Sequence, residues 1–227
     1  MKRLHVVRII IFLFLIILLN NNSFAQNKVL AFCLGQRVCA GVDICEILSN
    51  SAIIYDKIDY CTPVNTETAA LIRNNDYKII FCDHPPQKVN PKLFKEFVFN
   101  GGVLVIFHNV WIKCSVNINR IVPYLLYTSE GGADELKVNP KHPLFRNLEE
   151  MDYIDCCCDF RYFSRVGNEW TNIVDEKIVE ASYGKGHIIA LAIDASDSAY
   201  TEDANCTIFY DNLIDYAFRK ANLSQYD

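Results

Sequence analysis

Residues 91–107 read PKLFKEFVFNGGVLVIF and contain the signals of a helix, a turn and a strand in immediate succession. The apolar residues of segment 91–99 fall at i, i+1, i+4 and i+5, the spacing of an amphipathic helix. Pro91 suits the first helical turn, and Asn100-Gly101-Gly102 favours the end of the helix. Segment 103–107 (VLVIF) has no polar residue, which predicts a strand that is buried on both faces.

The same alternation of apolar strand and helix occurs in the preceding part of the chain. Strands are predicted at 28–34 (KVLAFCL), 52–58 (AIIYDKI) and 78–82 (KIIFC). Helices are predicted between them, at 42–48 and 66–73. Apolar strands that alternate with helices predict an α/β fold with a mostly parallel sheet and helices on both of its faces.

The chain after residue 108 has weaker signals until residue 177. We predict a helix at 119–127, a small strand at 135–138 and an irregular excursion over 139–176. Two strands, 177–182 and 187–193, are joined by the turn Tyr183-Gly184-Lys185-Gly186, a hairpin signal. An amphipathic helix at 208–219 closes the chain. No internal repeat or low-complexity linker divides residues 26–227, which we therefore interpret as one domain.

The first 25 residues have the pattern of a secretory signal peptide. Lys2, Arg3 and Arg8 are followed by an apolar run of about eleven residues, and Ser23-Phe24-Ala25 offers small residues for cleavage after Ala25. An uncut membrane anchor is the alternative, but a spanning helix needs about 20 apolar residues. The pattern predicts a secreted, periplasmic or other extracytoplasmic protein, with no membrane span after cleavage.

The charge balance excludes one class of partner. The 227-residue chain has a net charge of −5, and removal of the signal would leave 19 Lys and Arg against 27 Asp and Glu, a net charge of −8. Nucleic-acid binding needs a dense basic surface, so no nucleic-acid partner is expected.

Ten cysteines, all after residue 25, permit disulfides in an exported chain. Cys33 and Cys82 lie inside apolar runs, which favours buried thiols. The better candidates for disulfides are the remaining cysteines, namely Cys39, Cys45, Cys61, Cys114, Cys206 and the triplet Cys156-Cys157-Cys158. No C-x-x-C pair occurs, which argues against a zinc ribbon or a thioredoxin-type site.

Four segments carry a resemblance to a known superfold. They are segment 97–108 (FVFNGGVLVIFH), segment 142–148 (HPLFRNL), the turn Tyr183–Gly186 with the strand after it, and the closing helix. Together they resemble the class I glutamine amidotransferase-like superfold, and within it trehalose-utilisation (ThuA-like) proteins and β-galactosidase trimerisation domains. The resemblance covers most of residues 28–220 and implies a flavodoxin-like sheet.

The chain departs from the catalytic members of that superfold. They place a nucleophilic Cys at the elbow after the central strand, whereas His108 stands at the matching position here, as in the trehalose-utilisation branch. Ile106 replaces a Gly that amidotransferases usually keep, and no His-Pro-Glu follows residue 193. Glutamine hydrolysis by the usual triad is therefore not expected.

Polar residues follow the predicted parallel strands at the edge where ligands of such sheets gather. Asp83, His84, His108 and Asp194 are the candidate catalytic residues, because imidazoles and carboxylates that converge can bind a divalent metal or transfer protons. Asp197 belongs to the same group. Candidate ligand-binding residues at this edge are Gln36, Arg37 and Asn109.

Each of these residues also has a structural interpretation. Asp83 and Asp194 can cap the turns that follow their strands, and His108 can be a satisfied, half-buried histidine. His142, before Pro143, is expected to have a structural role. His187 begins a strand at the opposite end of the sheet and is excluded from the site.

Three functions fit these observations. The first is a binding or assembly domain without a nucleophilic Cys, for a carbohydrate, a small molecule or a protein partner, with Tyr153, Tyr162 and Trp170 available to wall a sugar cleft. The second is a metal-assisted hydrolase at the strand ends. The third is an enzyme with Cys33 or Cys82 as nucleophile. It is ranked last because neighbouring residues on a strand point to opposite faces, so a cysteine and the residue beside it seldom form a catalytic pair. The sequence names no cofactor and no metal.

Overall fold

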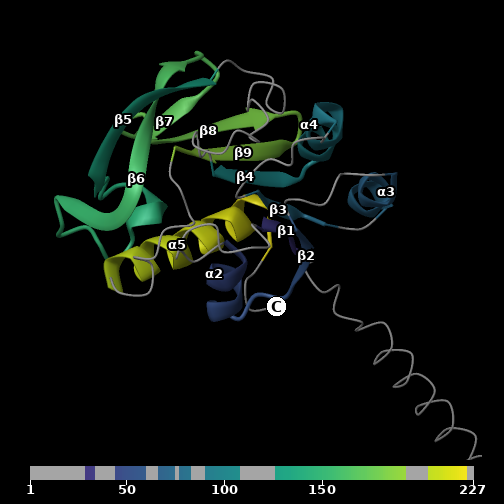
Figure 1. The fold of residues 1–227 in the computed structure, drawn as a ribbon, viewed down its shortest axis with the longest axis horizontal. Helices are drawn as coiled ribbons and strands as arrows, with labels where there is room; N and C mark the ends of the chain where they lie inside the picture. Colours follow the sequence, from purple (N-terminus) through teal and green to yellow (C-terminus); the bar gives the residue numbers. More distant parts are fainter. Residues whose placement is uncertain are drawn as a thin grey trace, which may run out of the picture.

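The computed structural model describes residues 29–33, 44–59, 66–74, 77–82, 90–107, 126–192 and 204–223 (Figure 1). Its elements, in chain order, are β1 (Val29–Cys33), α2 (Ile44–Asn50), β2 (Tyr55–Asp59), α3 (Thr66–Asn74), β3 (Ile79–Cys82), α4 (Pro91–Phe99), β4 (Val103–Phe107), β5 (Leu126–Lys137), the 3-10 helix η2 (Pro143–Phe145), β6 (Tyr153–Val166), β7 (Thr171–Val174), β8 (Ile178–Tyr183), β9 (Gly186–Leu191) and α5 (Ala204–Lys220).

The main sheet has seven strands in the order β2-β1-β3-β4-β9-β8-β7. Strands β2, β1, β3, β4 and β9 are parallel, and β8 and β7 continue the sheet in antiparallel fashion. Every residue of β1, β3 and β4 is buried, as their continuous apolar runs predict. The predicted mostly parallel sheet is therefore confirmed, with a mixed edge formed by the last hairpin.

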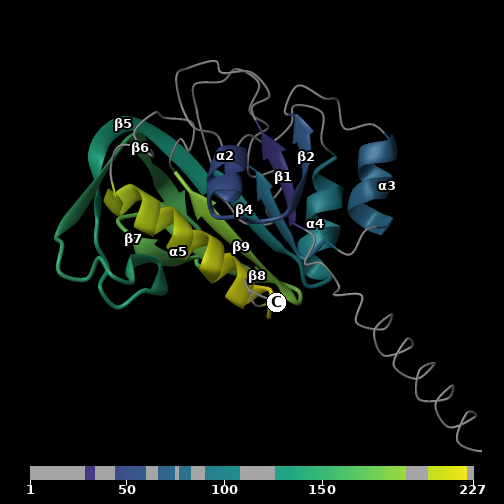
Figure 2. The same cartoon turned by 90° about the horizontal axis from the view of Figure 1, so that it is seen from below.

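Helices cover both faces of this sheet, as predicted. Alternate residues of each strand point to opposite faces, so the helices on each face pack against a different set of strand residues. Helices α2 and α5 pack with Ala31, Phe81 and Val105 on one face. Helices α3 and α4 pack with Phe32, Ile80 and other residues of the opposite face. Figure 2 shows α2 and α5 lying across the near side of the strands. Within the described residues, no helix is long and apolar enough to cross a membrane.

Two turns fit against each other at the amino edge of the parallel strands. Asn90 caps α4 by accepting a hydrogen bond from the Lys92 N–H, and the helix ends at Asn100-Gly101-Gly102. The β8–β9 turn packs on this end, since the Lys185 N–H donates to the Phe99 carbonyl at 3.0 Å. A Cβ atom on Gly186 would overlap the Val98 and Gly102 carbonyl oxygens, so this approach requires glycine.

The segment 142–148 forms η2 and its flanks, and η2 packs against α5. His142 caps η2 through Nδ1, which accepts from the Leu144 N–H at 3.4 Å, so its predicted structural role is confirmed. The buried Asn212 of α5 donates to the carbonyls of Leu144 and Arg146 at 3.2 and 2.8 Å. The rings of Phe145 and Phe209 complete the contact.

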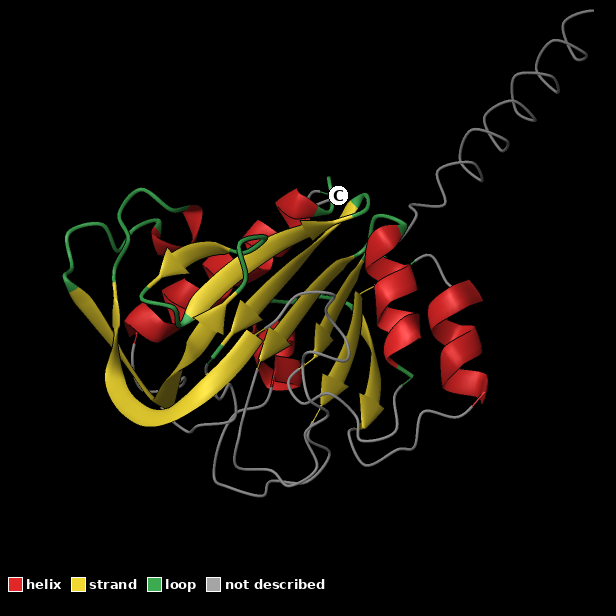
Figure 3. Ribbon diagram, turned by 90° about the horizontal axis from the view of Figure 1, so that it is seen from above, coloured by secondary structure: helices red, strands yellow, loops and turns green. Residues whose placement is uncertain are grey.

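Residues 126–166 differ most from the prediction. The expected small strand at 135–138 is the end of the twelve-residue strand β5, which also contains the last two residues of the expected helix 119–127. The segment interpreted as irregular, 139–176, contains the fourteen-residue strand β6 and the strand β7. Strands β5 and β6 form a separate antiparallel sheet with three register shifts, and Leu136 and Ile154 join the α5-side core. The long curved pair is visible in Figure 3.

Candidate functional site at the carboxyl edge of the sheet

Strands β1, β3, β4 and β9 are neighbours and run in the same direction, as the arrowheads in Figure 3 show. Cys82, the last residue of β3, is in register with Phe32 on β1 and Ile106 on β4. Phe107, the last residue of β4, is in register with Leu191 at the end of β9. The carboxyl ends of these strands therefore lie within about one residue of each other along a single edge.

The predicted site residues come after these strand ends in the sequence. All of them lie outside the described residues, namely Gln36, Arg37, Asp83, His84, His108, Asn109, Asp194 and Asp197. Asp83 directly follows the last residue of β3, and His108 directly follows the last residue of β4. The strand order thus brings together the points from which these segments depart, and the convergence of the side chains stays a prediction.

The order of the strands also creates a switch point at this edge. The path from β1 to β2 runs through α2, which packs on one face of the sheet. The path from β2 back to β3 runs through α3, which packs on the other face. Where successive connections leave for opposite faces, a crevice forms at the carboxyl ends, and open α/β sheets bind ligands there. In this sheet the switch point lies between β1 and β3.

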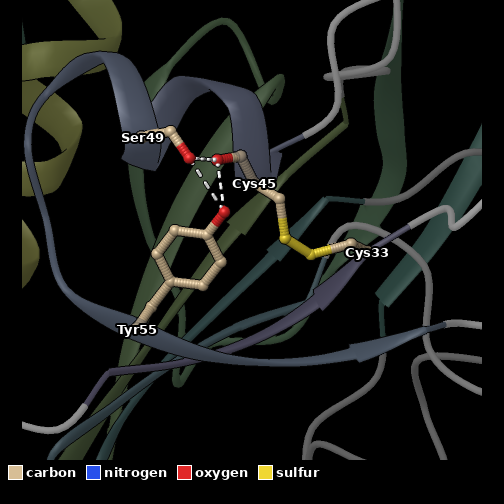
Figure 4. Close-up of a disulfide and its surroundings, with 4 residues drawn as sticks. All are labelled: Cys33, Cys45, Ser49 and Tyr55. Carbon is tan, nitrogen blue, oxygen red and sulfur yellow. Dashed lines mark hydrogen bonds between the residues drawn. A yellow bond between two sulfur atoms is a disulfide. The ribbon is translucent and has the colours of Figure 1, made fainter.

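A disulfide marks the same edge. Cys33, the last residue of β1, is bonded to Cys45 in the first turn of α2, with their Cα atoms 6.0 Å apart (Figure 4). The Cys45 carbonyl oxygen accepts hydrogen bonds from the Tyr55 hydroxyl at 2.9 Å and from the Ser49 hydroxyl at 2.8 Å. The bond from Tyr55 anchors this turn of α2 to β2. The disulfide joins the two ends of the segment 34–43, which contains Gln36 and Arg37.

The states of four cysteines correct two predictions and confirm two others. Cys33 was expected to be a buried thiol and is oxidised instead, so it is not a candidate nucleophile. Cys45 is confirmed as a disulfide cysteine, and Cys82 is confirmed as buried. Cys206, expected to be a disulfide candidate, is a buried free thiol in the packed face of α5. Its interior position, rather than a loop position, explains the difference.

Lys177 is a residue at this edge that the sequence analysis did not identify. It is only 8 % exposed, and its carbonyl accepts from the Ala192 N–H at 2.7 Å, beside the end of β9. Its Nζ donates to the Glu135 carbonyl at 2.5 Å. Burial lowers the pKa of Lys177, while Asp175 and Glu135 act in the opposite direction. Its burial involves β5, whose full extent was not predicted.

Other features of the predicted site are tested only in part. Among the described residues, no group of three His, Cys, Asp or Glu side chains is placed to hold a metal ion. Trp170 is buried in the core on the α3–α4 side, so it does not wall an open cleft. The side chain of Tyr153, which was also predicted to wall a sugar cleft, is 49 % exposed. The Tyr162 side chain lies outside the described part of the structure.

A second group of titratable side chains lies on the α5 face, away from this edge. Tyr216 and Lys220 both donate to one oxygen of Glu180, at 2.8 and 2.9 Å. The His142 ring packs edge-on against the Tyr216 ring, 5.0 Å between centroids. Burial and the hydrogen bond to Glu180 raise the pKa of Tyr216 far above its ordinary value. Burial lowers the pKa values of His142 and His187.

The register places His187 at the amino end of β9, opposite Val103, the first residue of β4. Its predicted position, at the end of the sheet opposite the predicted site residues, is therefore confirmed. The group around Glu180 joins α5, β8 and the segment before η2, which gives it a clear structural role.

The sequence matches no family model and no curated protein. Several solved structures nevertheless share its architecture. A ThuA-like protein from Bacteroides uniformis ATCC 8492 has a TM-score of 0.58 at 10% identity, over 90% of this chain and 96% of its own. The chain has the fold of a ThuA-like protein.

Two cytoplasmic proteins from Salmonella typhimurium also share this fold. Their TM-scores are 0.53 and 0.54 at 13% and 12% identity; each alignment covers 84% of this chain and 98% or 99% of the other. The location in their names does not support the exported location predicted here. A β-galactosidase from Bacillus circulans sp. alkalophilus, with a TM-score of 0.49 over 32% of its chain, is too distant to support the link to trimerisation domains.

Proposed function

We propose that this chain is an exported amidotransferase-like domain that binds a carbohydrate ligand at the carboxyl edge of its parallel strands. The observation that carries the proposal is the switch point between β1 and β3, beside which β4 ends at Phe107. Segments with Gln36, Arg37, Asp83 and His84 follow the two strands that flank this point. A partner protein that binds at the same edge is the alternative to a carbohydrate ligand.

The order of the parallel strands supports the amidotransferase-like character of the domain. The five parallel strands follow the order 2-1-3-4-5 that defines flavodoxin-like sheets, when they are numbered along the chain. His108 stands where the catalytic relatives carry their nucleophilic Cys, so we propose binding and not glutamine hydrolysis. The carbohydrate class rests on the resemblance to trehalose-utilisation proteins.

Export is part of the proposal and has its own support. A disulfide such as Cys33–Cys45 forms and persists in oxidising compartments outside the cytosol. The signal pattern of residues 1–25 agrees with this. Amino-terminal sequencing of the protein purified from its native organism should find a chain that begins at Gln26. A chain that begins at Met1 and remains in the cytosol would contradict export.

The binding proposal is tested by thermal unfolding in the presence of a glycan panel. At least one glycan at saturation should raise the melting temperature of the wild type, because ligands that bind only the native state stabilise it. His108→Ala should lose this increase. His187→Ala is the matched control, since it removes an imidazole at the opposite edge and should keep the increase. No response to any glycan, or equal responses in both variants, would argue against a carbohydrate site at this edge.

The alternative function is a metal-assisted hydrolase that uses Asp83, His84, His108 and Asp194. The adjacency of β3, β4 and β9 favours it, because these residues follow three neighbouring strand ends. Two imidazoles and two carboxylates form a suitable ligand set for Zn²⁺ or another first-row divalent metal. Equilibrium dialysis with Zn²⁺ should give stoichiometric binding that His108→Ala abolishes and His187→Ala retains. Full retention of Zn²⁺ by His108→Ala would remove this alternative.

A further inference from the structure

A cavity of about 270 Å³ lies at the amino edge of the sheet, far from the proposed carboxyl-edge site. It is lined by residues from the end of α3, the two residues before β3, helix α4 and the turn that follows α4. Its apolar wall is formed by Ile72, Leu93 and Phe97, and its charged wall by Arg73, Lys78 and Glu96. We refer to it as the amino-edge cavity.

The charges of the described residues that line this cavity are not balanced. Both oxygens of Glu96 are engaged, one with Arg73 at 3.4 Å and the other with Lys92 at 3.6 Å. Lys78 takes part in none of the ion pairs formed between described residues. The described lining therefore contains two cations and one anion, in a chain whose overall charge is −5. An ammonium group that lies beside an apolar wall and forms no ion pair with a described carboxylate favours a ligand with one negative charge.

The cavity walls are fixed by packing, so the site is formed before any ligand arrives. Leu93 is buried, and the Phe97 ring lies against the backbone of Gly102, where a Cβ atom would overlap it. Tyr77, which also lines the cavity, is held by a hydrogen bond from its hydroxyl group to Asp56 on β2. A preformed site avoids the entropy cost of ordering its walls upon binding.

We infer that the amino-edge cavity binds a small carboxylate with an aromatic or branched apolar body. The apolar body would lie against Ile72, Leu93 and Phe97, and the carboxylate would accept a charge-assisted hydrogen bond from the Lys78 ammonium group. The volume is just below the range of about 300–1,000 Å³ that is typical of drug-sized ligands, which limits the ligand to a small molecule.

Binding of probe compounds to the purified chain tests this inference. Phenylacetate and isovalerate should bind, as measured by NMR titration, and should shift the backbone amides of Lys78, Asn100 and Gly101. Phenylacetamide, which is neutral and of the same shape, should bind about tenfold more weakly than phenylacetate, since it cannot form the charged contact. Shifts that gather instead at Cys33, Cys82 and Phe107 would place the binding at the carboxyl edge and overturn the inference.

A pair of lysine variants isolates the charged contact. Lys78→Met keeps most of the length of the side chain and removes the charge, and it should weaken phenylacetate binding about tenfold while phenylacetamide binding stays unchanged. Lys137→Met, at an exposed position on β5, is the control and should bind both compounds as the wild type does. Equal loss of both compounds in Lys78→Met, or no loss of either, would overturn the role of Lys78. The glycan response of the carboxyl edge is independent of this result.

Discussion

The two edges of the main sheet differ in what their residues do. At the amino edge, α4 and the β8–β9 turn meet through backbone hydrogen bonds, and Gly186 allows the two turns to touch. At the carboxyl edge, four parallel strands end side by side, and the polar residues of the predicted site follow them in the sequence. The comparison teaches that the amino edge is held by two packed turns, whereas the proposed carboxyl-edge site depends on the segments that follow the strand ends.

Substitution at the packed turn should have the largest effect. Gly186→Ala places a methyl group against the carbonyl oxygens of Val98 and Gly102, and both belong to backbone that cannot move aside cheaply. We expect a loss of about 3 kcal/mol or more in the free energy of unfolding, measured by urea denaturation. Glu150→Ala, at an exposed position, should change the stability by less than about 0.5 kcal/mol. Near-normal stability of Gly186→Ala would show that the two turns are not tightly packed.

Loss of the disulfide should have the next largest effect, at the other edge. A double substitution Cys33→Ala and Cys45→Ala removes a cross-link between residues twelve positions apart. The chain-entropy model predicts a loss of about 3 kcal/mol in the free energy of unfolding. A dithiol reductant should lower the stability of the wild type by about this amount more than that of the double variant. Equal sensitivity of both proteins to the reductant would argue against this pairing.

Lys177 tests how the small sheet is held beside the carboxyl edge. Lys177→Ala removes the hydrogen bond to the Glu135 carbonyl and leaves a hole, so we expect a loss of about 2 kcal/mol. Lys177→Met fills most of the space without burying a charge, and should lose less than Lys177→Ala. Chemical denaturation of both variants measures the difference. A larger loss in Lys177→Met would mean that the charge itself stabilises the fold.

The smallest expected effect is a dependence of stability on pH through His142. Burial lowers the pKa of His142 in the folded state below the ordinary value of 6.5, so the unfolded chain binds a proton first as the pH falls. This contribution to stability is full above about pH 6.5 and decreases as the pH falls toward the folded pKa.

His142→Gln keeps an acceptor for the Leu144 N–H and cannot titrate, so it should reduce the slope of stability against pH below 6.5. His187, whose pKa is lowered for the same reason, also contributes to this slope. Thermal unfolding at a series of pH values measures both. An unchanged slope in His142→Gln would contradict the assignment.

Much of the fold follows from local sequence patterns. The all-apolar strands β1, β3 and β4 and the capped helix α4 are specified by their own residues, so their bounds differ from the prediction by no more than one residue. Strand β6 was not predicted, because its three consecutive cysteines and several charged residues make the alternation hard to recognise. Asp155, Asp159 and Arg161 alternate with less polar neighbours, a period of two that could have indicated a strand.

The candidate site shows where prediction from sequence ends. The mostly parallel direction of the strands could be predicted, and together with the observed strand order it determines which segments depart from one edge. The Cys33–Cys45 pairing could not, because cysteine positions alone do not define connectivity. The burial of Lys177 could not either, because it depends on β5, a strand more than forty residues earlier.

A crystal structure of the chain from Gln26 onward would test the central claim most directly, through the distances between the side chains of His108, His84, Asp83 and Asp194. We predict that they converge within about 4–6 Å in an open crevice at the ends of β1, β3 and β4. A His108 ring that is buried in packing, with Asp83 and Asp194 bonded only to the backbone of their own turns, would contradict a binding site at this edge.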